Sequence, residues 1–364
     1  MEPPEQSVPD PAQTALGSPL NRLLLEDAWR LFCIYDRTAI ATQRRFLRFR
    51  TSILILVVMA TALAILKSVF WGDSIQVTNI TQIFTSWGGF FYGLVIIAPI
   101  LVSILLVASV KFDRGMNWIL LRASAEIVKK EIYCYRAISA LEPQDSDMRL
   151  AEAIQVVTDR LMKTQVNRSG LAFSKDLEVG SEHLTKAVKQ SVCQDDEHPF
   201  AALDAQQYID HRLIDQLSWY RRKAVKLDQQ WQVFQWSIYV FGGLGTFLAA
   251  TRAEIWIAIT NAIASALTSF LDFKQLDTTL VSYNQAACNL ENLLCWWHAL
   301  TNEARLDQEN IKKLVLNTEK VIQAETTSWV QEMRDALSEL YAEEKKELSP
   351  EEQETTTDKL DRAV

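Results

Sequence analysis

Two pairs of apolar segments constrain this chain more than any other feature of its sequence. The first pair covers residues 51–71 and 86–110, and the second covers 234–251 and 255–271. Residues 86–110 contain 25 amino acids without a charge, which measure about 37 Å as a helix and exceed a hydrocarbon core of about 30 Å. The one charge in residues 51–71 is Lys67, which is close enough to the end to reach the headgroups. The pattern predicts an all-α integral membrane protein with two helical hairpins and four spans.

The second hairpin is the weaker of the two. Residues 255–271 provide only 17 uncharged amino acids, which is the lower limit for spanning, so a buried hairpin of a soluble protein is an alternative. The glycine-rich run in residues 234–251 lies inside an apolar helix, so it cannot form the phosphate-binding loop that joins a strand to a helix. We expect glycines in both hairpins to allow close helix packing, namely Gly89, Gly93, Gly242, Gly243 and Gly245.

The basic residues near the span ends predict the orientation. The short connections inside the hairpins contain one each, Lys67 and Arg252. Twelve lie on the other side: Arg44, Arg45, Arg48, Arg50, Lys111, Arg114, Arg122, Arg221, Arg222, Lys223, Lys226 and Lys274. Because basic loops stay in the cytoplasm, we expect a multi-pass protein of the inner (plasma) membrane with both termini cytoplasmic. Residues 1–20 carry five prolines, three acids and no Lys or Arg, which predicts a disordered leader rather than a cleavable signal peptide.

Outside the spans the apolar residues repeat with a helical period, and no segment alternates like a strand. A heptad seam leads into the third span: Leu213, Leu217, Tyr220, Ala224, Leu227 and Trp231. A long C-terminal helix has one face formed by Ile311, Leu314, Thr318, Ile322, Glu325, Trp329, Met333, Ala336 and Leu340. Residues 148–166 predict a shorter amphipathic helix, whereas residues 167–200 show little periodicity.

The two hairpins also predict an internal duplication. Setting Phe112 on Phe273 aligns Cys134 with Cys295 after the hairpins. The expected parts are a disordered leader at 1–20, a first two-span unit at 21–141, a cytoplasmic linker at 142–205, a second two-span unit at 206–301, an amphipathic helix at 302–348 and a disordered acidic tail at 349–364.

Enzyme chemistry and nucleic-acid binding find little support in the sequence. Cys295 and His298 share a helix face, but two ligands do not complete a metal site, and a structural role is the favoured interpretation. The net charge of −8 opposes a nucleic-acid groove. Five cysteines, an odd number without a C-x-x-C pair, predict free thiols. We therefore expect no catalytic residues, no cofactor, no metal and no nucleic-acid partner.

Two segments that flank the spans carry a family resemblance. The pre-span segment, residues 208–224, contains Tyr208, Arg212, Asp215, Gln216, Trp219, Tyr220 and Lys223. The post-span segment, residues 118–133, contains Trp118, Arg122, Glu126 and Lys129. Both resemble signatures of SLATT-type proteins, the SMODS- and SLOG-associating 2TM effector domains, long catalogued as a domain of unknown function. The signature is split between the halves, because the first half lacks the Asp-Gln pair before Tyr35 and the second half has Tyr283 where the post-span segment has Arg122.

The resemblance implies a membrane effector that forms a pore or passes ions in bacterial stress or defence signalling. Four spans cannot enclose a channel alone, so a homo-oligomer in the lipid bilayer is part of this expectation. Nothing in the chain resembles a nucleotide sensor, so a sensor or another cytoplasmic partner would be supplied by a separate protein. The alternative is a membrane-anchored scaffold whose cytoplasmic helices recruit a soluble partner.

The charged residues of these segments permit a second expectation. Salt bridges could join the two segments through Arg212, Asp215 and Arg222 on one side and Glu126, Lys129 and Glu131 on the other. Solvated helix faces, on which such charges contribute little, are the alternative.

The fourth span carries a polar stripe. Its members follow at i, i+4, i+7 and i+8 on one helix face: Asn261, Ser265, Thr268 and Ser269. Polar groups inside a membrane face a cavity or a neighbouring helix, so one interpretation is a pore lining. The other is helix packing, aided by Ala258, Ala262 and Ala266 on the adjacent face.

Overall fold

The computed structural model describes residues 21–71, 87–112, 114–139, 141–142, 145–164, 180–191 and 198–348. The predicted leader and the predicted acidic tail lie outside these residues. The chain divides into two compact units. Unit 1 consists of Met1–Ala41, Asn117–Ala224 and Val281–Val330, and unit 2 of Thr42–Met116, Val225–Leu280 and Gln331–Val364.

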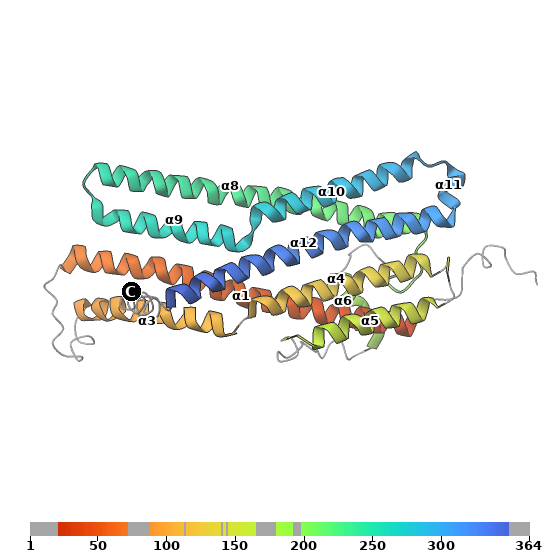
Figure 1. Ribbon diagram of the computed structural model, residues 1–364, viewed down its shortest axis with the longest axis horizontal. Helices are drawn as coiled ribbons and strands as arrows, with labels where there is room; N and C mark the ends of the chain where they lie inside the picture. The colour runs from red at the N-terminus through yellow and green to blue at the C-terminus, as the bar shows by residue number, and fades with distance from the viewer. Residues whose placement is uncertain are drawn as a thin grey trace, which may run out of the picture. The chain divides into compact units, whose positions relative to one another are not determined.

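Helices make up all the regular structure of the described residues, which confirms the predicted all-α fold class. The predicted spans lie in α1 (Arg22–Trp71), α3 (Trp87–Phe112), α8 (Asp215–Ala250) and α9 (Glu254–Lys274) (Figure 1). The other helices are α4 (Arg114–Ile138), α5 (Ser146–Met162), α6 (Gly180–Ser191), α7 (Ala205–Tyr208), the π-helix η3 (Ile209–Ile214), α10 (Leu276–Ala299), α11 (Asn302–Leu306) and α12 (Gln308–Leu348).

Four helical stretches are long and apolar enough to cross a membrane, and each overlaps one of the four predicted spans. Between 6% and 11% of the residues in their most apolar windows are buried within the chain. Apolar helix surfaces that the protein leaves uncovered over this length are suited to lipid rather than water. The structure therefore supports an all-α membrane protein with four membrane-crossing helices.

Continuity and interruption of the helices follow the local sequence. α1 extends for 50 residues and contains no glycine or proline that would break its hydrogen-bond ladder. Gln275 interrupts the helix between α9 and α10 with a left-handed φ of 48°. The predicted C-terminal helix at 302–348 is likewise divided, because the extended backbone of Asp307 separates α11 from α12.

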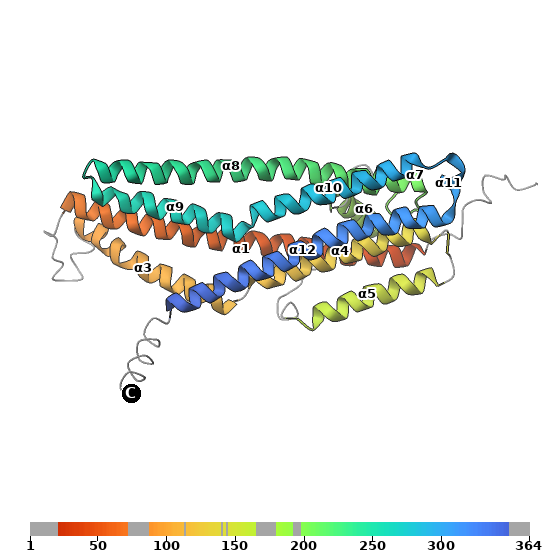
Figure 2. The same cartoon turned by 45° about the horizontal axis from the view of Figure 1, so that its top comes forward.

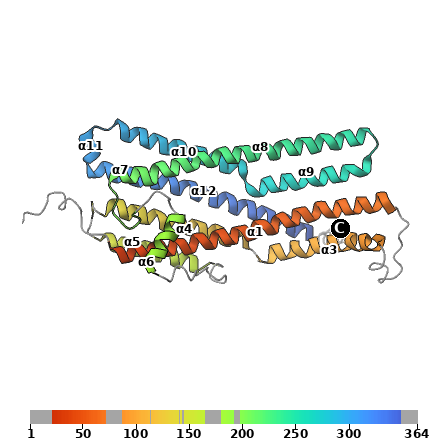
Figure 3. The same ribbon diagram turned by 180° about the vertical axis from the view of Figure 1, so that it is seen from behind.

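Unit 1 has a core rich in aromatic residues, to which α1, α4, α5 and α6 all contribute (Figure 3). Trp29 of α1 is fully buried and meets Tyr133 of α4 edge to face, with ring centroids 6.0 Å apart. The indole N–H of Trp29 donates to the carbonyl of Pro199 at 3.0 Å. Arg136, also buried, donates to the carbonyls of Ala201 at 2.8 Å and His198 at 2.9 Å. These hydrogen bonds hold residues 198–201, the segment before α7, against the core of unit 1.

Helix α6 departs from the expectation of little regular structure in residues 167–200. Ala187 and Val188 of this helix are buried in the core of unit 1. With 12 residues the helix is amphipathic but too short to be stable alone. Packing against the core, which local sequence does not reveal, supports it.

Unit 2 contains the two hairpins. Figure 2 shows the ribbon of the first hairpin, α1 with α3. In this hairpin the ammonium of Lys67 on α1 lies 5.7 Å from the ring of Tyr92 on α3. In the second, Phe234 of α8 packs on Phe270 of α9 with ring centroids 5.0 Å apart. The turn between α8 and α9 places Arg252 at a left-handed φ of 58°.

The glycines of the hairpins fall into two groups. Gly89 and Gly93 of α3 are buried, and a Cβ on Gly245 would lie 3.0 Å from the hydroxyl of Thr260 on α9. Gly245 therefore permits the close approach of α8 and α9. Gly242 and Gly243 are exposed, and a Cβ on either would meet no atom within 4 Å. Within the described chain these two glycines do not have the packing role expected of them.

Candidate functional site

A buried ion pair joins α12 to η3 inside unit 1. Arg212 donates from Nε and Nη2 to the two carboxylate oxygens of Glu319, both at 2.8 Å. The hydroxyl of Tyr208 donates to the same carboxylate at 3.0 Å. The side chains of Arg212 and Glu319 are 1% and 0% exposed. A bidentate pair without solvent is strongly oriented, and loss of either charge would leave the other buried alone.

The same guanidinium connects the pre-span and post-span segments. Its carbon lies 4.5 Å from the ring centroid of Tyr133 in the post-span segment, a cation–π contact that burial strengthens. Its Nη1 has no hydrogen-bond partner among the described residues. Arg212 therefore depends on Glu319 and on the aromatic face for its stabilisation.

The backbone at this point is specialised. α7 begins with a capping box, in which the carboxylate of Asp204 accepts from the N–H of Gln207 at 2.8 Å and the Gln207 side chain accepts from Asp204 N–H at 3.0 Å. The chain then forms the π-helix η3 before it continues as α8. A π turn shifts which residues face the core, and such turns are frequent at functional sites.

A second charged group surrounds Arg122 on α4. Its guanidinium pairs with Glu126 at 3.1 Å and with Asp36 of α1 at 3.5 Å. Lys129, one turn after Glu126, is buried, and its ammonium lies 5.9 Å from the ring of Phe32. Burial alone would raise the pKa of Glu126, but Arg122, Lys129 and Arg212 outweigh it and hold that pKa below its ordinary value. For Lys129, burial lowers the pKa more than Glu126 raises it.

Glu325 of α12 lies between these charges and a group of tyrosines. It accepts a hydrogen bond from the hydroxyl of Tyr220 on α8 at 3.2 Å. Burial raises the pKa of Glu325 to about 7; the bond from Tyr220 opposes this rise and the charge of Glu126 adds to it. A carboxyl group of this kind changes its charge near neutral pH.

Aromatic contacts surround the charged groups. Tyr283 of α10 packs on Trp219 and Tyr220, with ring centroids 5.3 Å and 5.4 Å apart. At the other end, Trp118 of α4 meets Trp329 of α12 at 5.2 Å. We call the charged and hydroxyl-bearing residues together the buried polar cluster: Asp36, Arg122, Glu126, Lys129, Tyr133, Tyr208, Arg212, Tyr220, Glu319 and Glu325. Seven of them are buried, whereas Arg122, Glu126 and Glu325 are partly exposed at its edge.

Most of the signature residues meet in this part of unit 1. Trp118, Arg122, Glu126, Lys129, Tyr208, Arg212 and Tyr220 lie in the cluster or against it. Asp215, Gln216 and Trp219 are half-buried, and the exposed Lys223 places its ammonium 5.5 Å from the ring of Trp219.

Among the described residues the expected charges interact at longer range, since Arg212 lowers the pKa of Glu126 and Asp215 raises that of Lys129, but the direct ion pairs have other partners. Arg212 binds Glu319 of α12 instead of a carboxylate of the post-span segment. Glu131 pairs with its neighbour Lys130 at 3.2 Å, and Arg222 is exposed. Sequence reasoning missed Glu319 and Asp36 because each lies far along the chain from its partner. For α12 the sequence did indicate a buried polar contact, because Glu325 lies on a helix face that is otherwise largely apolar.

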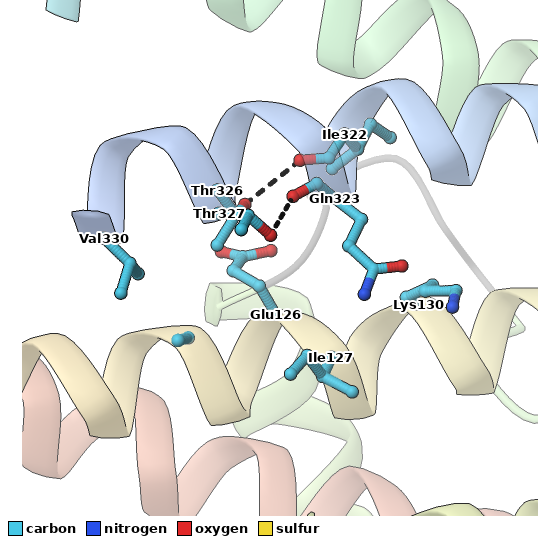
Figure 4. Close-up of a pocket in the computed structure, with 9 residues that line it drawn as sticks. Glu126, Ile127, Lys130, Ile322, Gln323, Thr326, Thr327 and Val330 are labelled. Carbon is cyan, nitrogen blue, oxygen red and sulfur yellow. Dashed lines mark hydrogen bonds between the residues drawn. The ribbon is translucent and has the colours of Figure 1, made fainter. Parts of the chain in front are cut away.

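A cavity of about 100 Å³ separates α4 from α12 next to the cluster. α4 lines it with Glu126, Ile127 and Lys130, and α12 lines it with Ile322, Gln323, Thr326, Thr327 and Val330 (Figure 4). Thr326 and Thr327 donate their hydroxyls to carbonyls of their own helix, at 3.1 Å and 2.8 Å. These two threonines therefore do not use their protons to bind α4.

The predicted polar stripe lies on an uncovered face of α9 in unit 2. Asn261, Ser265, Thr268 and Ser269 are all exposed. The exposed face is longer than the stripe and follows a spacing of four and three residues: Glu254, Ala258, Asn261, Ser265, Thr268 and Asp272. Asn261 lies near α8, since its Oδ1 would be 3.6 Å from a Cβ on Gly245, while the other residues of this face are exposed in the described part of the chain. Packing against a helix of another copy stays the alternative to a pore lining.

A comparison with known protein families supports the resemblance. Residues 208–329 match the family model of the SMODS and SLOG-associating 2TM effector domain 1. The match begins at Tyr208, which binds Glu319, and ends at Trp329, which packs on Trp118. No curated protein and no solved structure matches the chain. The match covers one hairpin, so the duplication stays a prediction, and residues 208–329 of this membrane protein are similar to the SMODS and SLOG-associating 2TM effector family.

Proposed function

We propose that this membrane effector acts as a homo-oligomeric pore lined by α9. The observation that carries the proposal is the exposed polar face of α9 inside an apolar span. Asn261 has a side-chain amide with two donors and an acceptor, and no hydrogen bond of this amide occurs within the described residues. Such a group facing lipid is unfavourable by several kcal/mol.

Other copies of the chain can remove this cost. If α9 helices from several copies surround an axis, the polar face meets water in a lumen while the apolar faces stay in lipid. The hydroxyl of Thr268 donates to the carbonyl of Ala264 at 3.0 Å, which leaves its oxygen as an acceptor toward the lumen. Small side chains on this face, Ala258 and Ser265, leave space for a water-filled path.

The ends of the face suggest the class of permeant ion. Glu254 lies at the first residue of α9 and Asp272 near its last turn, and both are exposed. In a ring of copies each position would form a ring of carboxylates, an arrangement that favours cations. Arg252 in the adjoining turn is the nearest exposed opposing charge. With the orientation expected from the basic residues, Glu254 would face the outside and Asp272 the cytoplasm.

Conductance of the purified protein in planar bilayers tests the pore directly. The pore predicts cation-selective channels, reduced conductance for Ser265→Leu with the oligomer intact, and a lower cation-to-anion permeability ratio for Glu254→Gln with Asp272→Asn. Absence of conductance at every protein density would favour the scaffold alternative.

Labelling gives an independent measurement. In a chain lacking its five native cysteines, Asn261→Cys, Ser265→Cys and Thr268→Cys should react with a small water-soluble thiol reagent. Val240→Cys is the matched control, because Val240 lies in a span and is 62% exposed on an apolar surface. Equal, slow labelling at Thr268→Cys and Val240→Cys would contradict a water-filled lumen.

A further inference from the structure

The charges around Glu325 do not balance. Arg122 pairs with both Asp36 and Glu126, and Glu325 lies in the field of the same arginine. Lys129 is the second cation of this group and also acts on Asp36 and Glu126. Arg37 also acts on Asp36 and Arg212 on Glu126, whereas Arg122 is the cation that acts on Glu325. Ionisation of Glu325 therefore adds a negative charge that only this shared arginine compensates. A proton on Glu325 removes that charge.

The groups that face Glu325 indicate which carboxyl group takes the proton. α8 contributes the hydroxyl of Tyr220, α10 contributes Tyr283, and α4 contributes Arg122 and Glu126. Arg122 already binds two other carboxylates at 3.1 Å and 3.5 Å. In the described part of the chain no cation lies within ion-pair distance of Glu325, which accepts a hydrogen bond from the neutral phenol of Tyr220. Glu325 is thus the least compensated carboxylate of the three.

We propose that Glu325 is a pH-sensitive latch, which holds α12 against α4 and α8 when its carboxyl group is protonated and loosens this contact when it ionises. The geometry makes such loosening local. Glu319, less than two turns earlier on α12, is held by the three hydrogen bonds from Arg212 and Tyr208. This anchor keeps the first part of α12 in place while the segment from Ile322 to Val330 can move.

The cavity between α4 and α12 supplies the freedom that a latch requires. It borders the moving segment, and Glu126 forms part of its wall (Figure 4). Glu325 itself is not part of the wall, but it is partly exposed, so a proton can reach its carboxyl group. Thr326 and Thr327 face this side of α12 but donate to their own helix, so they do not hold α12 to α4.

The direction of the effect follows from the burial of Glu325. Its pKa is about 7 in the folded protein and near the ordinary 4.5 in an opened segment. A raised folded pKa contributes stability that is fully present below 4.5 and is lost as the pH rises through 7. Between pH 6 and pH 8, the equilibrium constant for opening of the segment should rise about tenfold.

Hydrogen exchange of the full chain in lipid nanodiscs tests the latch. The quantity is the protection factor of peptides within residues 320–330 at pH 6 and pH 8, after correction for the intrinsic exchange rate. The wild type should lose about tenfold in protection over this interval. Glu325→Gln keeps the shape and the bond to Tyr220 without the charge, and it should show no pH dependence. Glu309→Gln, at an exposed position on the same helix, should behave as the wild type.

Tyr220→Phe separates the latch from a general loss of packing. The bond from Tyr220 lowers the pKa of Glu325, so its removal should move the midpoint of the protection profile to higher pH. A wild-type profile without pH dependence, or the same dependence in Glu325→Gln, would overturn the latch. These measurements concern unit 1 alone, so they can succeed or fail whether or not α9 lines a pore.

Discussion

Replacing Glu319 with glutamine should destabilise unit 1 more than any change to an exposed charge. The substitution preserves the shape but removes the charge that compensates Arg212, whose side chain is only 1% exposed. Both bidentate bonds, at 2.8 Å, weaken together, and Nη1 has no alternative partner among the described residues. Breaking one side of a buried pair costs about 3–5 kcal/mol. For a unit of this size the cost corresponds to a fall in melting temperature of about 6–20 °C.

An exposed ion pair of unit 1 provides a matched control. Arg221 of α8 pairs with Glu291 of α10 at 2.6 Å, but the two side chains are 54% and 51% exposed. Because water solvates both charges, Glu291→Gln should cost at most about 1 kcal/mol. Thermal unfolding in detergent, followed by tryptophan fluorescence, compares the two variants. Glu319→Gln should lower the melting temperature more than Glu291→Gln. Burial explains this difference, because the exposed pair has the shorter distance of the two.

The double variant Arg212→Met with Glu319→Met tests whether the uncompensated charge of Arg212 causes the loss of stability. Removing both charges leaves no uncompensated ion, so most of the loss seen in Glu319→Gln should be recovered. Equal melting temperatures for Glu319→Gln and Glu291→Gln would refute the idea that the buried pair stabilises unit 1. A double variant that is less stable than both Arg212→Met alone and Glu319→Met alone would also contradict it.

Three further predictions concern other parts of the chain. Leu217→Asp places a charge at a buried position of the heptad seam and should cost several kcal/mol; an unchanged melting temperature would contradict the packed seam. Gly245→Val should destabilise the α8–α9 hairpin by about 1–3 kcal/mol, because the Cβ position lies 3.0 Å from Thr260, whereas Gly242→Val at an open position should not. Reporter fusions after residues 25, 170 and 345 should report the cytoplasm and one within residues 74–85 the outside, and a cytoplasmic signal from the last would reverse the expected orientation.

The fold could be predicted from the sequence to the extent that local patterns determine it. Apolar length located the four spans, and the heptad seam is buried at Leu213, Leu217, Tyr220 and Ala224. Further along the seam, Trp231 is exposed, since in that region the helix has no described protein surface to bury it. α6 was not predictable, because tertiary packing rather than its own period stabilises it.

The site was predictable residue by residue but not as a set of contacts. The signature positions were identified, whereas their partners Glu319 and Asp36 were not. Sequence periodicity shows which residues share one helix face, but it does not show which helix that face meets. Arg212 and Glu319 are 107 residues apart along the chain, so only the packing of α12 on η3 brings them together.

The split signature has a physical explanation in the buried polar cluster. The complete pre-span segment comes from the second half of the chain and the complete post-span segment from the first half, and they meet where Arg212 lies on the ring of Tyr133. In the predicted repeat, Tyr283 corresponds to Arg122. Arg122 binds Asp36 and Glu126, whereas Tyr283 packs on Trp219 and Tyr220. Each half thus supplies what the other lacks, and one set of charges serves unit 1. A second full set would add buried charges that require their own partners, so a chain that joins two such hairpins needs the signature only once.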